Sequence, residues 1–299
     1  MACQACAGTA ADRVRTVHEV TLVRERLLRA SGIPDPYRQL KEREAESWFD
    51  PGCAALTRAW ALGVEAGSRE ALAELLGGLL AGNLFDLGSH STQQAFREGK
   101  LDPVAARIRY RAEAHLLLGR FEAGALALLL PRPRSLEDPP EGRMLLLADN
   151  AGADFLTGAL PAAVYFARRW EVLLVVNSEP ASSDITIAEA RALWARLAAR
   201  EGSPLARLGD AGRLRLVPSG TGSPGIDLRH VGEELSRAAQ DARWLLIEGQ
   251  GRAIETNWST RFRVPSLRAA LAKDTRVAAA IGTPPGSALL RWEGRALEK

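Results

Sequence analysis

The chain has 299 residues, of which 46% are hydrophobic and 25% charged, and its formal net charge is +3. This composition is ordinary for a folded globular protein and excludes a disordered chain, a collagen-like repeat and a small disulfide scaffold. At this length we expect one large α/β domain, or such a domain with a helical lobe. Three cysteines and four scattered histidines do not have the spacing of a zinc site.

The basic residues are dominated by arginine, since only four of the 39 are lysines. They are spread along the chain without a basic run interleaved with aromatic residues, so no nucleic-acid partner is expected. No apolar stretch approaches the ~20 residues that span a bilayer, and the N-terminal segment lacks the apolar core of a signal peptide. A soluble, cytoplasmic protein without a membrane partner is predicted. Nothing in the sequence indicates its oligomeric state.

The first part of the chain has helical periodicity. Apolar side chains recur at three- and four-residue spacing in residues 14–30, 69–87 and 104–130. Four prolines follow within ten residues, a density that cannot continue a helix. We therefore predict an all-helical N-terminal lobe over residues 1–130 and a proline-rich linker over residues 131–142.

Residues 143–299 alternate between short apolar runs and longer helical periods, which predicts an α/β domain. Apolar runs of this length fit strands that are buried on both faces of a parallel sheet. Thr186, with Glu189 three residues later, predicts a capped helix after the second strand. The expected fold is a doubly wound, mostly parallel sheet flanked by helices, with a strand order that the pattern does not define. The predicted strands are Met144–Ala148, Val172–Val176, Leu214–Val217, Trp244–Ile247, Val277–Ile281 and Ala288–Trp292.

Polar residues follow the first two predicted strands. Asp149 and Asn150 come after the first strand, and Asp184 follows the second. Ligands of open α/β sheets bind beyond the carboxyl ends of the strands, so we expect these side chains to meet at one edge. Two carboxylates and an amide offer hard oxygen ligands for a divalent cation such as Mg²⁺ or Mn²⁺. The alternative is that they cap helices and close turns, as Asp and Asn often do.

Further candidates surround this set. Asp154 lies in the first turn of the next predicted helix, where free N–H groups can receive an anion. Arg252, shortly after Gly249, has the planar fork that binds two phosphate oxygens, with a surface arginine as the alternative. In the helical lobe, Asn83 and Asp86 share a helix face. They either support the metal ligands from behind or form a polar stripe.

The segment Gly220–Gly225 matches the spacing GxGxxG after a strand, and Glu248 ends the next strand. A dinucleotide site uses such glycines for the pyrophosphate and such an acid for the ribose. However, Pro224 and Asp227 stand at the entry of the helix predicted to follow, and this strand is the third rather than the first. A nucleotide-dependent oxidoreductase therefore stays as an alternative.

The order and spacing of several short stretches carry more information than any one of them. These stretches are Pro34–Tyr37, Leu80–Asp86, Ala148–Asn150, Asn177–Ser178, Asp184–Thr186, Thr221–Ser223 and Glu248–Ala253. Through them, and over roughly residues 25–293, the chain resembles the damage-control metal-dependent phosphatases, once catalogued as a family of unknown function. It is most similar to the subfamily with a Glu-Gly-Met-Gly-Arg motif, typified by the phosphatase domain fused to an inactive pantothenate kinase.

The resemblance implies a phosphatase that hydrolyses small phosphomonoester metabolites with a divalent metal ion (Mn²⁺, Co²⁺, Ni²⁺ or Mg²⁺). The implied substrates are 4′-phosphopantetheine and its oxidised or damaged forms, which places the protein in metabolite damage control and coenzyme A metabolism. The implied metal ligands are Asp149, Asn150 and Asp184. Metal-assisted hydrolysis would then use Asp149 and Arg252 as catalytic residues, with Asp154 as the candidate general acid or base from its position alone.

The same interpretation assigns residues around the metal. Those expected to bind substrate or phosphate are Gly152, Ser219, Gly222, Glu248, Gly249, Arg252 and Asn257, and those expected to support the ligands by hydrogen bonding are Asn83, Asp86 and Asn177. The chain also departs from the family pattern: Ser183 stands where asparagine is usual, Glu179 where glycine is usual, and Gln250 replaces the methionine of the motif. The first two departures leave a non-catalytic, phosphopantetheine-binding regulator as a second alternative.

Overall fold

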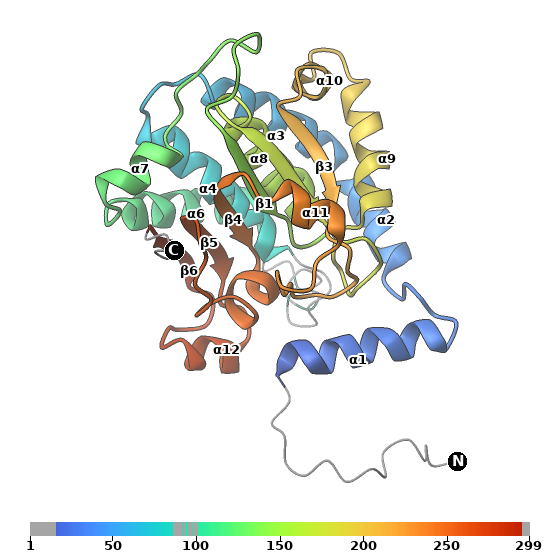
Figure 1. The fold of residues 1–299 in the computed structure, drawn as a ribbon. Helices are drawn as coiled ribbons and strands as arrows, with labels where there is room; N and C mark the ends of the chain where they lie inside the picture. The colour runs from blue at the N-terminus through green and yellow to red at the C-terminus, as the bar shows by residue number, and fades with distance from the viewer. Residues whose placement is uncertain (1–15, 86–91, 93, 95–97, 99–100, 295–299) are drawn as a thin grey trace, which may run out of the picture.

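The computed structural model describes residues 16–85, 92, 94, 98 and 101–294, which fold around a six-stranded sheet (Figure 1). The strand order is β3-β2-β1-β4-β5-β6; the first five strands are parallel and β6 is antiparallel to β5. This is the mostly parallel α/β fold that the sequence predicts. The strands are β1 (Arg143–Leu147), β2 (Glu171–Val176), β3 (Leu214–Pro218), β4 (Ala242–Glu248), β5 (Ser266–Leu271) and β6 (Ala288–Glu293).

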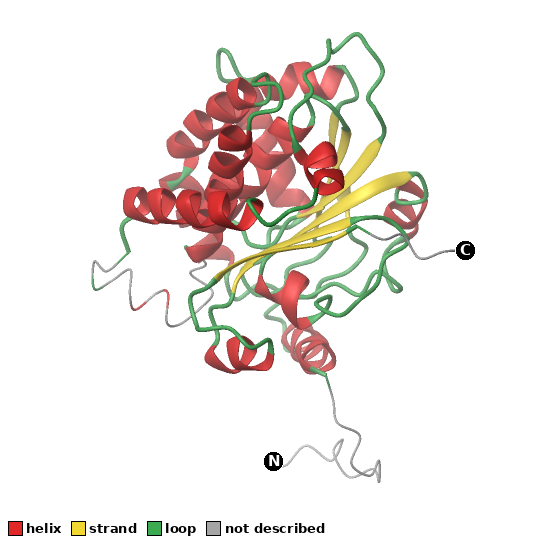
Figure 2. Ribbon diagram, turned by 90° about the vertical axis from the view of Figure 1, so that its left-hand side faces the viewer, coloured by secondary structure: helices red, strands yellow, loops and turns green. Residues whose placement is uncertain are grey.

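Successive side chains of each strand point to opposite faces of the sheet and build two hydrophobic cores. In β1, Met144 and Leu146 belong to one core, and Leu145 and Leu147 to the other. Figure 2 shows most helices on one side of the sheet. The helices that contribute to this first core are α3 (Phe49–Leu62), α4 (Arg69–Leu84), α6 (Pro103–Leu118), α7 (Ala123–Leu129), α8 (Leu160–Phe166), α9 (Ile187–Ala198) and α10 (Pro204–Asp210).

The second face is covered by shorter elements from the C-terminal half. These are α11 (Glu233–Ala238), α12 (Thr275–Ala280) and the π-helical turn η3 (Gln250–Glu255). A second π-helical turn, η2 (Asp154–Ala159), leads into α8. Both π-helical turns follow strands that end at the same edge of the sheet, and π-helical turns frequently occur at functional sites.

The N-terminal helices agree with the predicted periods only in part. The predicted helices over residues 14–30 and 69–87 correspond to α1 (Val17–Ala30) and α4. The period over residues 104–130 is instead two helices, α6 and α7, because the chain turns at residues 119–122. Between α1 and α4 lie α2 (Arg38–Ser47) and α3, neither of which the named periods predicted.

The proline-rich segment 131–142 contains no helix or strand. It is nevertheless anchored, because Arg213 donates hydrogen bonds to the carbonyl oxygens of Ser135 (2.8 Å) and Asp138 (2.6 Å). Helices from both sides of this segment share the first core. The division into a lobe over residues 1–130 and a domain over residues 143–299 stays a prediction.

One predicted strand is wrong. Residues 277–281 form most of α12 and its C-terminal cap, because Asp274 caps the helix by accepting hydrogen bonds from the N–H groups of Arg276 and Val277. The strand that belongs in this place is β5. Its apolar run is interrupted by Arg268, a fully buried residue whose guanidinium donates to the backbone carbonyl of Asn257.

Local sequence signals predicted the start of α9 correctly and the start of α11 incorrectly. Thr186 and Glu189 form the predicted capping box at the start of α9. Asp227, in contrast, does not begin a helix, because its carboxylate accepts from the backbone and side chain of Arg229 in a turn. The next helix, α11, begins only at Glu233. No described helix is both long and apolar enough to cross a membrane.

Candidate active site

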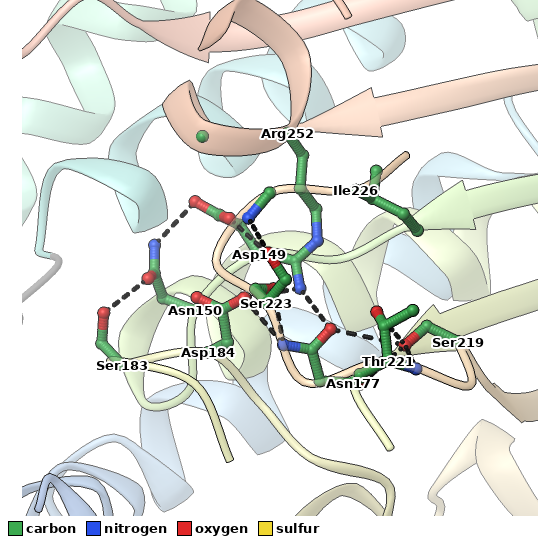
Figure 3. Close-up of polar contacts among 12 residues, drawn as sticks. Asp149, Asn150, Asn177, Ser183, Asp184, Ser219, Thr221, Ser223, Ile226 and Arg252 are labelled. Carbon is green, nitrogen blue, oxygen red and sulfur yellow. Dashed lines mark hydrogen bonds and ion pairs between the residues drawn. The ribbon is translucent and has the colours of Figure 1, made fainter. Parts of the chain in front are cut away.

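The centre of the site is a buried ion-pair triad from three separate segments (Figure 3). Asp149 follows β1, Asp184 lies in the loop after β2, and Arg252 lies in η3 after β4. Nη1 of Arg252 is 2.5 Å from Oδ1 of Asp149, and Nη2 is 2.7 Å from Oδ2 of Asp184. A single guanidinium therefore bridges the two carboxylates. The sequence predicted that these carboxylates converge, and the structure places them together.

The bridge fixes the charge of the arginine. Burial by itself lowers the pKa of Arg252, but the carboxylates of Asp184 and Asp149 outweigh it and raise that pKa above its usual value. The side chain is 2% exposed. Its guanidinium is thus directed at the carboxylates, whereas the sequence pattern suggested a phosphate as its partner.

Asn150 joins the triad to Asp154. Its Nδ2 donates to Oδ2 of Asp149 (2.9 Å) and to Oδ2 of Asp154 (2.9 Å), and its Oδ1 accepts from the Ser183 hydroxyl (2.8 Å). Asp154 also accepts from the Asn150 backbone N–H and from Nδ2 of Asn83 (2.9 Å). These bonds orient the amide of Asn150, and they show that Ser183 contacts one of the predicted metal ligands.

Asn177 and Asn83 hold the acidic residues from two sides. Nδ2 of Asn177 donates to Oδ2 of Asp184 (3.0 Å), and its Oδ1 accepts from Nη2 of Arg252 (3.1 Å). Asn83, near the end of α4, donates to Asp154 and more weakly to Oδ2 of Asp149 (3.4 Å). The third predicted supporting residue, Asp86, lies outside the described residues.

Two glycines allow close approach of acidic side chains. Gly249 has φ +87°, and a Cβ there would lie 2.0 Å from Oδ2 of Asp149. Gly152 has φ +64°, and a Cβ there would lie 2.2 Å from Oε2 of the buried Glu44 in α2. Both positions combine left-handed backbone with no room for a side chain. Both glycines, which were predicted to approach phosphate, approach carboxylates.

Glu248 lies behind the triad rather than in the pocket. Its carboxyl group is fully buried beside those of Asp154 and Asp149. Burial, and then the charge of Asp154, raises the pKa of Glu248 well above its usual value. Folding therefore favours the protonated form of Glu248, and in this geometry the residue supports Asp149 and Asp154.

Three predicted phosphate-binding residues are engaged in loop contacts. The hydroxyl of Ser219 contacts the backbone and side chain of Thr221. The carbonyl of Gly222 accepts from Arg29 of α1 (2.9 Å). Nδ2 of Asn257 donates to backbone carbonyls, including that of Arg252 (2.9 Å). These contacts stabilise the loops around the triad.

A pocket of about 270 Å³ opens beside the triad. Asp149, Asn150 and Asp184 all line it. The other lining residues are Ser182, Ser183, Pro224, Gln250, Gly251, Glu255, Lys273 and Asp274. The pocket is thus polar, and it contains the predicted oxygen ligands together with one lysine.

Lys273 is the main residue that the sequence interpretation missed. It follows β5, the strand that the prediction lacked, so nothing placed it at the edge of the sheet. Its Nζ donates to the backbone carbonyl of Asn83 (3.0 Å) at the end of α4. The available signal was its rarity, because the whole chain has only four lysines.

The predicted metal ligands offer carboxylate and amide oxygen atoms, which suit a hard divalent cation. Within the described ranges, no three His, Cys, Asp or Glu side chains gather as a metal site. The predicted set has two carboxylates, and its third member is the amide of Asn150. Two carboxylates, one amide oxygen and water are ligands that Mg²⁺ and Mn²⁺ accept.

The glycine-rich segment does not form a dinucleotide site of the usual kind. Residues 219–232, all of them described, contain no helix. The pyrophosphate of a dinucleotide is bound at the N-terminus of a helix that directly follows the glycines. The segment instead contacts α1 through the carbonyl of Gly222. It also packs against η3, because a Cβ placed on Gly251 would lie only 2.6 Å from the carbonyl oxygen of Pro224.

Sequence comparison finds similar proteins over most of the chain. The sequence pattern of the damage-control phosphatase ARMT1-like domain matches residues 8–289. Pantothenate kinase 2 of Arabidopsis thaliana is 34% identical over 277 residues, which are 86% of this chain and 30% of that protein. Damage-control phosphatase At2g17340 of Arabidopsis thaliana is 30% identical over 274 residues, covering 87% of this chain and 67% of that protein.

A more distant similarity is to the 4′-phosphopantetheine phosphatase of Mus musculus, which is 26% identical over 331 residues, covering 93% of this chain and 38% of that protein. The chain therefore spans about a third of the length of the mouse protein and of pantothenate kinase 2. A crystal structure of a DUF89 family protein from Pyrococcus horikoshii has the same fold, with a TM-score of 0.51 and 16% identity. The match covers 90% of this chain and 79% of that one.

Proposed function

Because the chain belongs to the damage-control phosphatase family with the ARMT1-like domain, we propose that it hydrolyses small phosphomonoester metabolites. The reaction takes place in the pocket lined by Asp149, Asn150 and Asp184, and these three residues would hold a divalent cation there. The observation that carries the proposal is the double contact of Arg252, which holds two carboxylates from different loops at one point of a polar pocket.

The cation, when bound, would polarise the phosphoryl oxygens and lower the pKa of a bound water. The chain itself supplies the positive charge around the phosphate. Lys273 lines the pocket, and Arg252 offsets the charge of Asp149 and Asp184 from behind. Fixed charges of this kind stabilise a transition state without reorganisation at the moment of reaction.

Asp154 is the residue that we assign to proton transfer. Its Oδ2 accepts hydrogen bonds from Asn83 and from both N–H groups of Asn150, so its position is fixed. A general acid or base needs a defined position; Asp154 is 1% exposed and contacts the pocket through Asn150, which lines it. Glu248, whose pKa is raised by burial and by the charge of Asp154, lies beside Asp154 on the core side of the site.

We propose 4′-phosphopantetheine and its oxidised or damaged forms as the substrates. The mouse relative is named as a 4′-phosphopantetheine phosphatase, and an Arabidopsis relative as a damage-control phosphatase. The pocket fits a phosphate and an adjoining polar group, since its volume of about 270 Å³ is lined mainly by polar residues. The metal is one of Mn²⁺, Co²⁺, Ni²⁺ and Mg²⁺.

A panel of phosphorylated metabolites, assayed for phosphate release with each of these metals, tests the proposal. Asp149→Asn and Asp184→Asn are expected to lower kcat by about 10²-fold or more while the circular-dichroism spectrum stays unchanged. Asp241→Asn, at an exposed position, is the matched control. Normal turnover in either active-site variant would remove the cation from the reaction. Phosphopantetheine binding without turnover with any metal would instead favour the regulator alternative.

A further inference from the structure

Lys273 reaches the pocket from a short loop between β5 and α12. Among the described residues the only lysines are Lys41 and Lys273, and Lys41 is buried in an ion pair elsewhere. Lys273 is therefore the one lysine among the described residues that lines the pocket. A lysine side chain has a flexible stem and carries high rotamer entropy, so the position of its ammonium depends on how firmly its backbone is held.

The backbone of Lys273 is held by the side chain of Gln250. Oε1 of Gln250 accepts from the N–H of Lys273 (2.7 Å) and from the N–H of Asp274 (3.0 Å). At the other end of the same amide, Nε2 donates to Oε1 of Glu255 (2.8 Å). One side chain thus links the beginning of η3, the end of η3 and the loop that carries Lys273.

The bonds of Gln250 require an amide. Methionine at this position can neither accept two backbone N–H groups strongly nor donate to Glu255. Glutamate would keep the acceptor for the two N–H groups, but it would lose the donor and face Glu255 with a like charge. Gln250 is also the position at which the chain departs from the Glu-Gly-Met-Gly-Arg motif, so the link is a property of this chain.

We infer that Gln250 is a positioning residue, which holds the Lys273 loop so that the ammonium binds the phosphate of the substrate. The inference rests on the proposed phosphatase function and adds to it the origin of phosphate affinity. It requires that Gln250 act through Lys273. Loss of the Gln250 amide should then weaken phosphate binding by no more than the contribution that Lys273 makes to that binding.

A double-mutant cycle of Gln250→Met and Lys273→Met tests this requirement. We expect Gln250→Met to raise KM for the phosphate ester and Ki for inorganic phosphate by about fivefold to tenfold, which corresponds to one ordinary hydrogen bond. In the Lys273→Met background, the same substitution should change KM by less than about twofold. Independent, multiplying effects of the two substitutions would overturn the inference, as would an unchanged Ki in Gln250→Met.

Two further variants separate positioning from general loss of structure. Gln240→Met makes the same chemical change at an exposed turn and should leave KM and Ki at wild-type values. Gln250→Glu should recover part of the phosphate affinity, because it keeps the acceptor for Lys273 and Asp274. An effect of Gln250→Glu equal to or larger than that of Gln250→Met would contradict the role of the acceptor.

A chemical readout keeps this inference distinct from the proposed function. The reactivity of the Lys273 amine toward an acylating reagent, followed by mass spectrometry, should be lowered by inorganic phosphate in the wild type and in Gln240→Met. In Gln250→Met we expect that protection to require about tenfold more phosphate. If the wild type hydrolyses no phosphate ester but shows this difference, only the proposed function fails. If it is active and the difference is absent, only the role of Gln250 fails.

Discussion

The ammonium of Lys41 lies 2.7 Å from Oε1 of Glu189, and this contact ties the N-terminal helices to the loop of the active site. Lys41, in α2, also contacts Asp35 at 2.8 Å and is 3% exposed. The second oxygen of Glu189 accepts from the backbone and hydroxyl of Thr186, two residues after Asp184. This series of side-chain contacts from Asp35 to Thr186 thereby fixes the loop that carries Asp184, one of the two converging carboxylates.

We predict that Lys41→Met destabilises the protein by about 2–4 kcal/mol, because it leaves the largely buried Asp35 and the half-buried Glu189 without their cation. Urea denaturation followed by circular dichroism measures the loss. The control is Arg38→Met in the same helix, whose partner Glu42 is exposed, and there little change is expected. Equal stability of the two variants would show that the buried link is not stabilising.

Arg252→Met is expected to leave Asp149 and Asp184 facing each other without a counter-charge. In the presence of a chelator, we predict a loss of about 3–5 kcal/mol, the usual cost of breaking a buried ion pair on one side. Added Mn²⁺ should raise the Tm of the variant by more than that of the wild type, because the cation replaces the missing charge. A smaller metal-induced shift in the variant would argue against a shared cation. Arg200→Met, at an exposed pair with Asp50, is the control.

Gly249→Ala separates steric conflict from backbone strain. A Cβ at Gly249 would lie 2.0 Å from Oδ2 of Asp149, whereas at Gly282, with φ +70°, it would meet nothing within 4 Å. Gly282→Ala should therefore cost only the left-handed backbone, about 1–2 kcal/mol, and retain phosphatase activity. Gly249→Ala should lose more stability and nearly all activity. Similar kcat values for both variants would contradict the close approach of Gly249 to Asp149.

Glu248 predicts a specific dependence of stability on pH. Its pKa is raised in the folded protein, so above about pH 4.5 the unfolded state binds fewer protons than the folded state. The contribution of Glu248 to stability therefore declines as pH rises through that range. Glu248→Gln mimics the protonated carboxyl group, so its free energy of unfolding should not show this decline with pH. The free energy of unfolding of Glu248→Gln minus that of the wild type, measured with a chelator, should rise between pH 5 and pH 8.

A difference between the two proteins that stays constant with pH would show that the carboxyl of Glu248 does not hold its proton on folding. The same measurement with Glu248→Ala distinguishes lost packing from a change in proton binding. Removal of the fully buried side chain should destabilise the protein at both pH values.

The sequence by itself determined the elements whose signals are local. Apolar runs located β1, β2 and β4 within about two residues, because a strand buried on both faces needs such a run. The capping box of Thr186 located α9 because it depends only on residues three positions apart in the sequence. Asp149, Asn150 and Asp184 could be placed at one edge of the sheet because the loops after buried strands of a parallel sheet gather there.

Only the tertiary structure decided which distant groups meet. Residues 277–281 were predicted as a strand because a short apolar run fits a helix as well as a strand. The β5 segment was missed because it contains Arg268, which is compatible with a core strand only when folding supplies hydrogen-bond acceptors for its guanidinium. Lys273 reached the pocket through that unpredicted strand. The partners of Arg252 and the link from Gln250 to the Lys273 loop depend on contacts between segments far apart in the chain. Local residue patterns carry no information about such contacts, because the pairing of strands and loops is settled by packing of the whole chain.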